Sequence, residues 1–247
     1  MLTTRIIPVL LLYHGRMVKT KQFQAMRDVG NPKTAVRIYN AQDVDELMFL
    51  DISATQEGRP TLCNFISEVS EECFVPLVAG GGVKTIEDVR SLLRSGADMV
   101  VINTQAFLTP TLISESAIKF GSQAVAVSVD VKNGTVWINR ATVDTGVSPE
   151  EWIAKAVEFG AGEIVLTAVE REGMMGGYDY DLIQKISSRL PIPLVANGGA
   201  GNLQHMVEAV DSGADAVAAS SIFHFTDQSP IKARSYLSDK NILVRMV

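Results

Sequence analysis

Two glycine-rich segments, each followed later in the chain by a polar pair, carry the clearest chemical signal in the sequence. Gly80-Gly81-Gly82 precedes Asn103-Thr104, and Gly198-Gly199 precedes Ser220-Ser221. Glycines let an anion approach the main chain, and amide and hydroxyl groups donate hydrogen bonds to its oxygens. Tight turns alone would also explain the glycines. Because a polar pair recurs in both places, the pattern favours two phosphate-binding sites.

A further glycine-rich stretch, residues 171–179, predicts a flexible loop beside the second site. Two anion sites indicate an elongated, phosphorylated small molecule with a negative group at each end. The residues expected to bind it are Gly81, Gly82, Asn103, Thr104, Gly173, Gly198, Gly199, Ser220 and Ser221.

Asp130 is the residue best suited to proton transfer. It ends an apolar run, where an acid is costly unless it is used or paired. A catalytic role satisfies that condition, and so does an ion pair with Lys132 or Lys19. Asp51, which also ends an apolar run, is either a second acid or a group that orients the loop beginning at Ser53.

The composition argues against several other classes of ligand. The three histidines, His14, His205 and His224, lack the spacing of metal ligands, and the two cysteines are too few for a zinc site or a disulfide framework. We therefore expect no metal and no cofactor. The net charge of −6 argues against binding nucleic acid or a membrane by bulk attraction.

The apolar start of the chain, residues 6–13, is interpreted as a first strand. A secretion signal would continue into a small-residue cleavage site, and none follows. Nor does any apolar stretch approach the roughly 18 residues that a membrane helix needs. With only two cysteines, the expected compartment is a reducing cytoplasm.

Eight short apolar runs predict strands, and the segments between most of them have the pattern of helices. The runs span residues 5–12, 46–52, 75–82, 98–104, 123–131, 162–169, 192–199 and 215–221. Helix starts are indicated by Thr85, by Thr109-Pro110 and by Ser148-Pro149. Alternating strands and helices predict a parallel sheet with right-handed crossovers.

An internal repeat predicts how that sheet closes. "VPLVAGGGV" at 75–83 resembles "IPLVANGGA" at 192–200, and "SGAD" recurs at 95–98 and 212–215, so both pairs are 117 residues apart. A constant offset of nearly half the chain predicts one α/β domain, a (β/α)8 TIM barrel built from half-barrels of about 1–120 and 121–247. No G-x-G-x-x-G segment follows the first strand to support an open doubly wound sheet.

These motifs, in this order, resemble the HisF family, the cyclase subunit of imidazole glycerol phosphate synthase in histidine biosynthesis. The stretches that carry the resemblance include "RIIPVLLL", "DELMFLDISAT", "VAGGGV", "FGSQAVAVSVD", "GAGEIVLTAVEREG" and "AASSIFHF". The resemblance implies a barrel that receives ammonia from a glutaminase docked at its amino-terminal face. The ammonia would attack a bisphosphorylated ribonucleotide at the other face.

The resemblance also implies two carboxylates that act as general acid and base. One corresponds to Asp130, and the other falls at Leu11, which faces Asp130 when Gly15 is aligned with Gly134. Leucine cannot transfer a proton, and each such group typically contributes 10²–10⁴-fold to the rate. Glu172 or Asp51 could take over the missing role.

Other family positions are partly retained. Lys19 corresponds to a substrate-contacting lysine in the loop after the first strand, although a solvated surface lysine is the alternative. Arg5, Glu46 and Glu163 match a charged ammonia gate at the barrel floor, while the lysine expected after "GAD" is Met99. Asp98 matches a residue that contacts the glutaminase.

The leucine-rich first strand resembles a subgroup linked to surface polysaccharide pathways, such as lipopolysaccharide synthesis. Those proteins are thought to convert an N-acetyl group on a sugar into an acetamidino group, a reaction that needs no ring closure. On this basis the sequence favours sugar amidination. A true histidine-pathway cyclase, a related barrel isomerase without an ammonia route, and a non-catalytic glutaminase-binding homologue are the alternatives.

Overall fold

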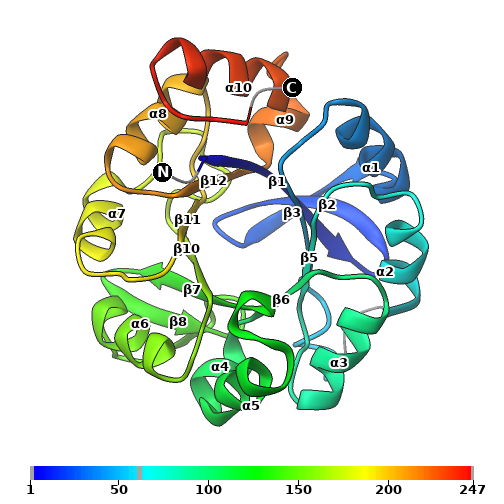
Figure 1. The fold of residues 1–247 in the computed structure, drawn as a ribbon, viewed down its shortest axis with the longest axis vertical. Coiled ribbons are helices and arrows are strands. Elements are labelled where there is room, and N and C mark those ends of the chain that lie inside the picture. The colour runs from blue at the N-terminus through cyan, green and yellow to red at the C-terminus, as the bar shows by residue number, and fades with distance from the viewer. Residues whose placement is uncertain (1–2, 60–62, 246–247) are drawn as a thin grey trace.

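Parallel strands form a closed barrel at the centre of the molecule (Figure 1). The computed structural model describes residues 3–59 and 63–245. Within them, the ring is made of eight strands: β1 (Arg5–Tyr13), β4 (Leu47–Asp51), β5 (Leu77–Gly80), β6 (Met99–Ile102), β7 (Val125–Lys132), β10 (Glu163–Ala168), β11 (Leu194–Asn197) and β12 (Ala216–Ala219). It closes because β12 pairs with β1 and β7 with β10. The predicted (β/α)8 TIM barrel is confirmed.

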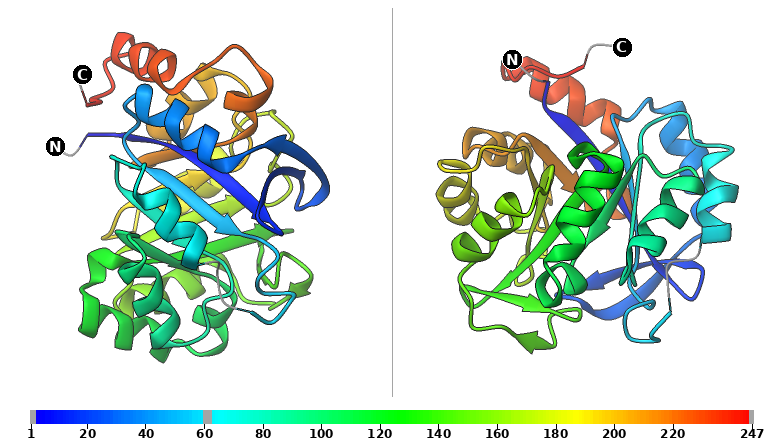
Figure 2. Two further views of the ribbon diagram at one scale, coloured as in Figure 1. Left: turned by 90° about the vertical axis from the view of Figure 1, so that its right-hand side faces the viewer. Right: turned by 60° about the horizontal axis from the view of Figure 1, so that its bottom comes forward.

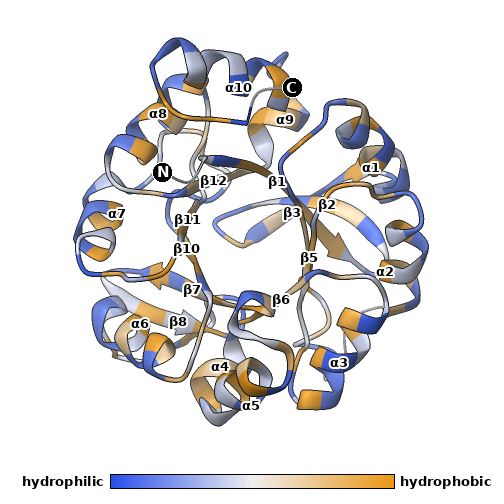
Figure 3. Ribbon diagram, viewed as in Figure 1, coloured by the Kyte–Doolittle hydropathy of each residue, from blue (hydrophilic) through white to orange (hydrophobic). Residues whose placement is uncertain are grey.

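Helices surround the strands, and each of them combines hydrophilic and hydrophobic segments (Figure 3). They are α1 (Pro32–Ala41), α2 (Cys63–Ser70), α3 (Ile86–Arg94), α4 (Thr104–Leu108), α5 (Thr111–Phe120), α6 (Pro149–Glu158), α7 (Tyr180–Ser187), α8 (Leu203–Asp211), α9 (Ser221–Phe225) and α10 (Pro230–Asp239), with a 3-10 turn at Ser122–Ala124. None of those in the described part of the chain has the length and apolar character needed to cross a membrane.

Two of the three predicted helix starts are capped as expected. Thr85 forms a capping box with Asp88 at the start of α3, and the Ser148 hydroxyl accepts a hydrogen bond from the backbone N–H of Glu151 in α6. The third differs, because Pro110 is the N-cap of α5 and no side chain caps this helix.

The internal repeat is visible in matching hydrogen bonds. The Asp98 carboxylate accepts from the backbone N–H of Leu77 at 2.8 Å, and Asp215 accepts from Leu194 at 2.9 Å. Both donors and both acceptors are 117 residues apart. The repeat in the sequence is therefore a repeat in the strand-to-strand contacts of the barrel.

Strand β1 shows how side chains alternate between two apolar layers. Leu10 and Leu12 are fully buried in the layer between strands and helices. Leu11 points the other way and packs against the cluster inside the barrel. That inner cluster consists of Ile7, Val9, Met48, Val78, Val101, Ala126, Val165, Val195, Ala216 and Ala218.

Two antiparallel hairpins, which were not predicted, extend two of the barrel strands. Strands β2 (Arg16–Lys21) and β3 (Gln24–Gly30) continue from β1, and β8 (Thr135–Ile138) and β9 (Val143–Asp144) continue from β7. The β2–β3 hairpin projects across the barrel axis in Figure 1. Both chain ends lie at the opposite end of the barrel (Figure 2). The hairpins thus stand over the carboxyl ends of the strands, where enzymes with this fold carry their active sites.

Candidate active site

A pocket opens at the carboxyl ends of the barrel strands and has a volume of about 1330 Å³, including its mouth. The pocket brings together most of the predicted site residues, namely Asp51, Gly81, Gly82, Asn103, Thr104, Asp130, Glu172, Gly173, Gly198, Gly199, Ser220 and Ser221. Lys19 does not line it, and neither do Arg5, Glu46, Glu163 and Asp98.

Asp130 is a buried acid with its hydrogen bonds arranged around the carboxyl group. The amide Nδ2 of Asn103 donates to its Oδ2 at 2.8 Å. Burial raises the pKa of Asp130 to about 7, although hydrogen bonds from Asn103, Ser128 and Thr167 favour the charged form. Near neutral pH this side chain can therefore either accept or donate a proton.

Neither ion pair considered for Asp130 is formed. In the described residues the salt bridges do not include Asp130 with Lys132 or Lys19. The ammonium group of Lys132 instead lies 4.5 Å from the centre of the Trp137 ring. The carboxyl group remains open to the pocket.

Leu11 occupies the position across the barrel from Asp130. Both residues stand three positions before a hairpin turn, at His14-Gly15 and at Asn133-Gly134, and each pairs with the opposite arm of its hairpin. Their strands, β1 and β7, are four places apart in a ring of eight described strands. The alignment of the two turns is thus supported by the structure, and an apolar side chain faces the retained acid across the pocket.

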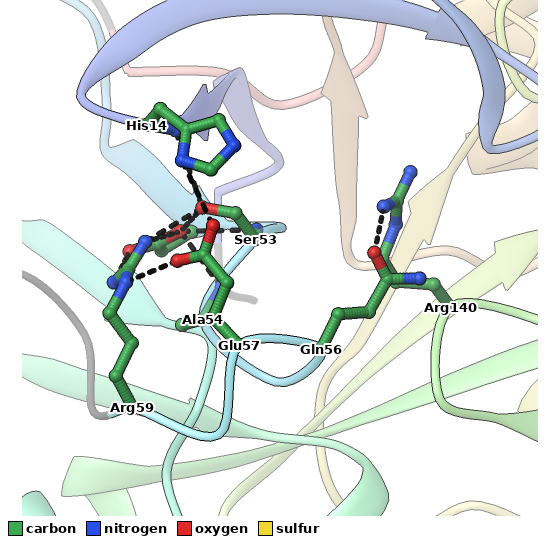
Figure 4. Close-up of polar contacts among 8 residues, drawn as sticks. His14, Ser53, Ala54, Gln56, Glu57, Arg59 and Arg140 are labelled. Atoms are coloured by element: carbon green, nitrogen blue, oxygen red, sulfur yellow. Dashed lines mark hydrogen bonds and ion pairs between the residues drawn. The ribbon is translucent and has the colours of Figure 1, made fainter.

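Asp51 is held by its own loop. Its Oδ1 accepts hydrogen bonds from the backbone N–H and hydroxyl of Ser53 at 3.1 and 2.9 Å, and its Oδ2 pairs with Arg59 at 2.7 Å. Figure 4 shows Arg59 reaching Ser53 and Glu57, while His14 contacts Glu57. The Asp51 carboxylate thus connects the end of β4 to the loop that begins at Ser53.

Glu172 is another carboxylate that lines the pocket with Asp130. Its two oxygens accept hydrogen bonds from the Thr20 hydroxyl at 3.0 Å and from the backbone N–H of Phe23 at 3.1 Å. It thereby ties the loop after β10 to the β2–β3 hairpin. Arg140 connects the same hairpin to the loop after β4, because it donates hydrogen bonds to the Phe23 carbonyl and to the Gln56 side chain (Figure 4).

Lys19 is not the solvated surface lysine of the alternative interpretation. It belongs to strand β2 rather than to a loop, and only 2% of its surface is exposed. Its ammonium group donates to the Val9 carbonyl at 2.8 Å and to the Ser220 hydroxyl. Burial lowers the pKa of Lys19 to about 7, while the charge of Glu172 opposes the shift. The lysine is packed inward because β2 pairs with β1, and it lies beneath the second predicted phosphate site.

The glycines of both predicted phosphate sites are also required by packing. A Cβ atom on Gly81 would lie 2.1 Å from the Asp51 carbonyl oxygen, and one on Gly199 would lie 2.1 Å from that of Gly177. The two sites lie on opposite sides of the ring, after β5 and β6 and after β11 and β12. A ligand that contacts both sites would therefore have to reach across the mouth of the barrel.

Several pocket residues were not predicted. They include Thr20, Phe23, Lys84, Ser128, Arg140, Thr167 and Asn197. The strand alternation could have found three of them, because Ser128 lies two residues before Asp130, and Thr167 and Asn197 lie at matching strand ends. Lys84 and Arg140 add positive charge at the rim, on loops whose course the sequence does not reveal.

The charged residues at the floor form one cluster at the other end of the barrel. Arg5 donates to Glu46 Oε2 at 2.7 Å and also to Glu163 Oε2. Met99, at the start of β6, packs against the inner apolar cluster. Asp98 lies at the same end, where its hydrogen bond to Leu77 gives it a structural role.

The sequence was compared with those of known proteins. The profile of a family described as "Histidine biosynthesis protein" matches residues 5–229. A protein of Chloroherpeton thalassium named "Imidazole glycerol phosphate synthase subunit HisF" is 46% identical over 251 aligned residues, which cover 100% of both chains. The chain belongs to the HisF family. It is therefore a HisF-like member of a cyclase and lyase family.

Other HisF proteins extend the match. The HisF subunit of Caulobacter vibrioides is 46% identical and that of Wolinella succinogenes 43%, over 253 and 251 aligned residues that cover at least 97% of each chain. The resemblance seen in the sequence is thus confirmed at the level of the HisF family. The names of these relatives give no support to the subgroup that modifies polysaccharides, and they fit histidine biosynthesis better.

Proposed function

We propose that this chain is the synthase subunit of a two-chain enzyme that adds ammonia to a phosphorylated small molecule bound in the barrel mouth. The observation that carries this proposal is the buried carboxyl group of Asp130, which faces a pocket between two glycine-lined sites. A pKa of about 7 suits it to move a proton as the nitrogen attacks.

Ammonia would come from a partner glutaminase at the floor. Arg5, Glu46 and Glu163 would admit it, and Asp98 would contribute to the docking surface. Between floor and mouth the barrel is lined by small and branched apolar side chains. Such a lining suits neutral ammonia, because a charged ion would be costly there.

The substrate that the relatives favour is the bisphosphorylated ribonucleotide of histidine biosynthesis, with imidazole glycerol phosphate as the product. One phosphate would bind at Gly81, Gly82 and Thr104, and the other at Gly198, Gly199, Ser220 and Ser221, above Lys19. Ring closure needs two proton-transfer groups. Glu172 is the available partner for Asp130, since it faces the same pocket and its charge acts on that acid.

One observation favours a second candidate. Leu11 presents an apolar side chain to the pocket where the family resemblance implies an acid. Addition of ammonia to an activated N-acetyl group, with loss of water, needs no ring closure and tolerates that leucine. Formation of an acetamidino sugar in a polysaccharide pathway is therefore the alternative.

The deciding experiment supplies the purified chain with ammonium chloride and the histidine-pathway ribonucleotide and measures imidazole formation. Turnover by the unaltered chain supports the histidine cyclase. If the unaltered chain forms no imidazole and Leu11→Asp does, the result supports the second candidate, because the added acid restores the missing group. Leu50→Asp is the matched control, because Leu50 lines the same pocket from another strand. If neither the unaltered chain nor Leu11→Asp turns over, and the chain binds no sulfate, the synthase proposal fails in favour of a non-catalytic homologue.

A further inference from the structure

A second cavity lies outside the barrel mouth, between the β2–β3 hairpin, helix α1 and the segment that runs from α9 to α10. Its volume is about 660 Å³ including its mouth, and about 260 Å³ measured to the centres of water-sized spheres. Of the described residues, none lines both this cavity and the candidate active site. Its walls include Met17 and Val29 of the hairpin, Ala35 and Tyr39 of α1, and Phe223 and His224 of α9.

The elements around this cavity belong to the first and last βα-units of the barrel. Strand β12, which precedes α9, pairs with β1, which leads into the hairpin and α1. Figure 1 shows α1 and α9 on the same side of the barrel. The rings of Tyr39 in α1 and His224 in α9 are in edge-to-face orientation, with centroids 6.3 Å apart. The cavity is therefore enclosed where the two ends of the βα-repeat meet.

The lining of the cavity is uncharged. Among the described residues that form it, none is a lysine, arginine, aspartate or glutamate. Burial raises the pKa of the Tyr39 hydroxyl, so this group stays protonated. Burial also lowers the pKa of His224 to about 3, and the positive charge of Lys19 adds to that shift. A charged ligand would thus lose its hydration and meet no opposite charge.

Two residues that line the cavity each have a buried polar atom without a hydrogen-bond partner among the described residues. They are Gln42, through its amide oxygen Oε1, and His224, through Nε2. The amide oxygen can only accept, whereas the role of the ring nitrogen depends on its tautomer. An apolar molecule that displaces water from the cavity would leave the Gln42 oxygen unpaired, which is costly. A ligand with an N–H or O–H group avoids that cost.

The size and walls of the cavity suit a single aromatic ring. An apolar cavity of about 150 Å³ in another protein holds benzene, and the present one is larger. Met17 contributes a thioether, and Phe223 and Tyr39 contribute aromatic rings. These groups make favourable contacts with the faces and edges of an aromatic ligand.

We propose that this cavity is a second ligand site, which binds a small uncharged aromatic molecule through an N–H or O–H group that donates to Gln42. The site does not depend on the reaction in the barrel mouth. It lies behind the second predicted phosphate site, because Met17 is two residues before Lys19 in β2 and His224 is one helical turn after Ser220. Lys19 and Ser220 are hydrogen-bonded to each other, so a ligand here touches both elements that position them.

The test uses phenol as the probe, with toluene as the ligand of similar shape that lacks a donor. Methyl ¹³C NMR follows Met17 in the cavity and Leu11 in the barrel mouth. Phenol should shift the Met17 signal saturably, with a Kd on the order of 1 mM, and leave Leu11 unchanged. If Met17 shows no saturable shift below about 20 mM phenol, or if Leu11 responds equally, the proposal is overturned.

A matched pair of glutamine variants tests the hydrogen bond. Gln42→Leu should weaken phenol binding about tenfold relative to toluene binding, because it removes the acceptor and keeps a similar volume. Gln228→Leu is the control, since Gln228 lines the same cavity but its amide donates to Asp227. This control should leave the ratio of the two affinities within about twofold of the original. An unchanged ratio in Gln42→Leu would contradict the proposal.

Filling the cavity gives a second test that does not depend on Gln42. Ala35 is buried in α1 and lines the cavity, so Ala35→Leu should weaken the binding of both phenol and toluene at least about tenfold. Ala41→Leu, at the exposed end of the same helix, should leave both affinities unchanged. Undiminished phenol binding in Ala35→Leu would place the ligand elsewhere and reject the site.

Discussion

The side chain of Asn103 donates a 2.8 Å hydrogen bond to Asp130, although the sequence pattern assigns Asn103 to a phosphate. Asn103 follows β6, and Asp130 lies two residues before the end of the neighbouring strand β7. The parallel register pairs Ile102 with Val127, so both residues come from the carboxyl-terminal parts of adjacent strands. Asn103 is therefore a positioning residue for the acid. Its hydrogen bond favours the charged form of the carboxyl group.

Removing that amide should make Asp130 a stronger base. In Asn103→Ala the pKa of Asp130 should rise by about 0.5–1 unit, because the charged form loses a donor. The ¹³C titration of the Asp130 carboxyl carbon measures the change. Gln105→Ala is the matched control, since it removes an amide from the same pocket that bonds to Thr109 and not to the acid. An unchanged pKa in Asn103→Ala would contradict the assignment.

Asp130→Asn should make stability less dependent on pH. Because the folded-state pKa of Asp130 is about 7 and the unfolded value is about 4, its contribution is favourable below about pH 4 and is lost as pH rises through 7. Relative to the unaltered chain, the variant should therefore gain about 2 kcal/mol in the free energy of unfolding between about pH 5 and 8. Urea unfolding at the two pH values measures this, with Asp211→Asn, on the exposed end of α8, as the control. A gain that is equal in both variants would reject the buried-acid interpretation.

Lys19 should make anion binding depend on pH. Its pKa of about 7 leaves it charged in mildly acidic solution and neutral in mildly basic solution, so sulfate, which does not titrate there, should bind roughly tenfold more weakly at about pH 8.5 than at about pH 6. Calorimetry in the Asp130→Asn background removes the contribution of the acid. Lys19→Met should bind weakly at both pH values, whereas Lys84→Met should lose affinity and keep the pH dependence. A pH dependence that survives in Lys19→Met would assign the effect to another group.

Gly199→Ala should strongly lower the free energy of unfolding. The added Cβ would meet the Gly177 carbonyl oxygen at 2.1 Å, and φ at this position is +120°, so neither the contact nor the backbone tolerates a side chain. A loss of at least about 3 kcal/mol in the free energy of unfolding is expected. Gly176→Ala, next to the contacted residue but with open space around it, should change stability by less than about 1 kcal/mol. Thermal unfolding of both variants provides the comparison, and similar melting temperatures would contradict the packing argument.

The barrel could be predicted because its determinants repeat along the chain. Eight apolar runs, capped helices and the 117-residue offset are local or periodic signals, and the hydrogen bonds of Asp98 and Asp215 preserve that offset. The hairpins were missed although a signal was present. His14-Gly15 and Asn133-Gly134 both adopt positive φ, as a two-residue hairpin turn requires.

The sequence predicts which residues line the site better than it predicts which of their side chains form hydrogen bonds or ion pairs with one another. Glycines and polar residues at strand ends reach the pocket because the strand ends of a parallel barrel converge. Which groups pair within it depends on side-chain packing between distant segments, so Asp51 with Arg59, Asn103 with Asp130, and Lys19 with Ser220 could not be foreseen. The burial of Lys19 could not be predicted either, because it follows from the pairing of β2 with β1.

Strand β1 carries structural side chains on one face and a side chain that contacts the pocket on the other. Leu10 and Leu12 hold the barrel to its helices, while Leu11, between them, touches only the interior and the mouth. A substitution at Leu11 can therefore alter the chemistry of the pocket while the packing of Leu10 and Leu12 against the helices stays intact. Proteins built this way can acquire new chemistry one inward-facing position at a time.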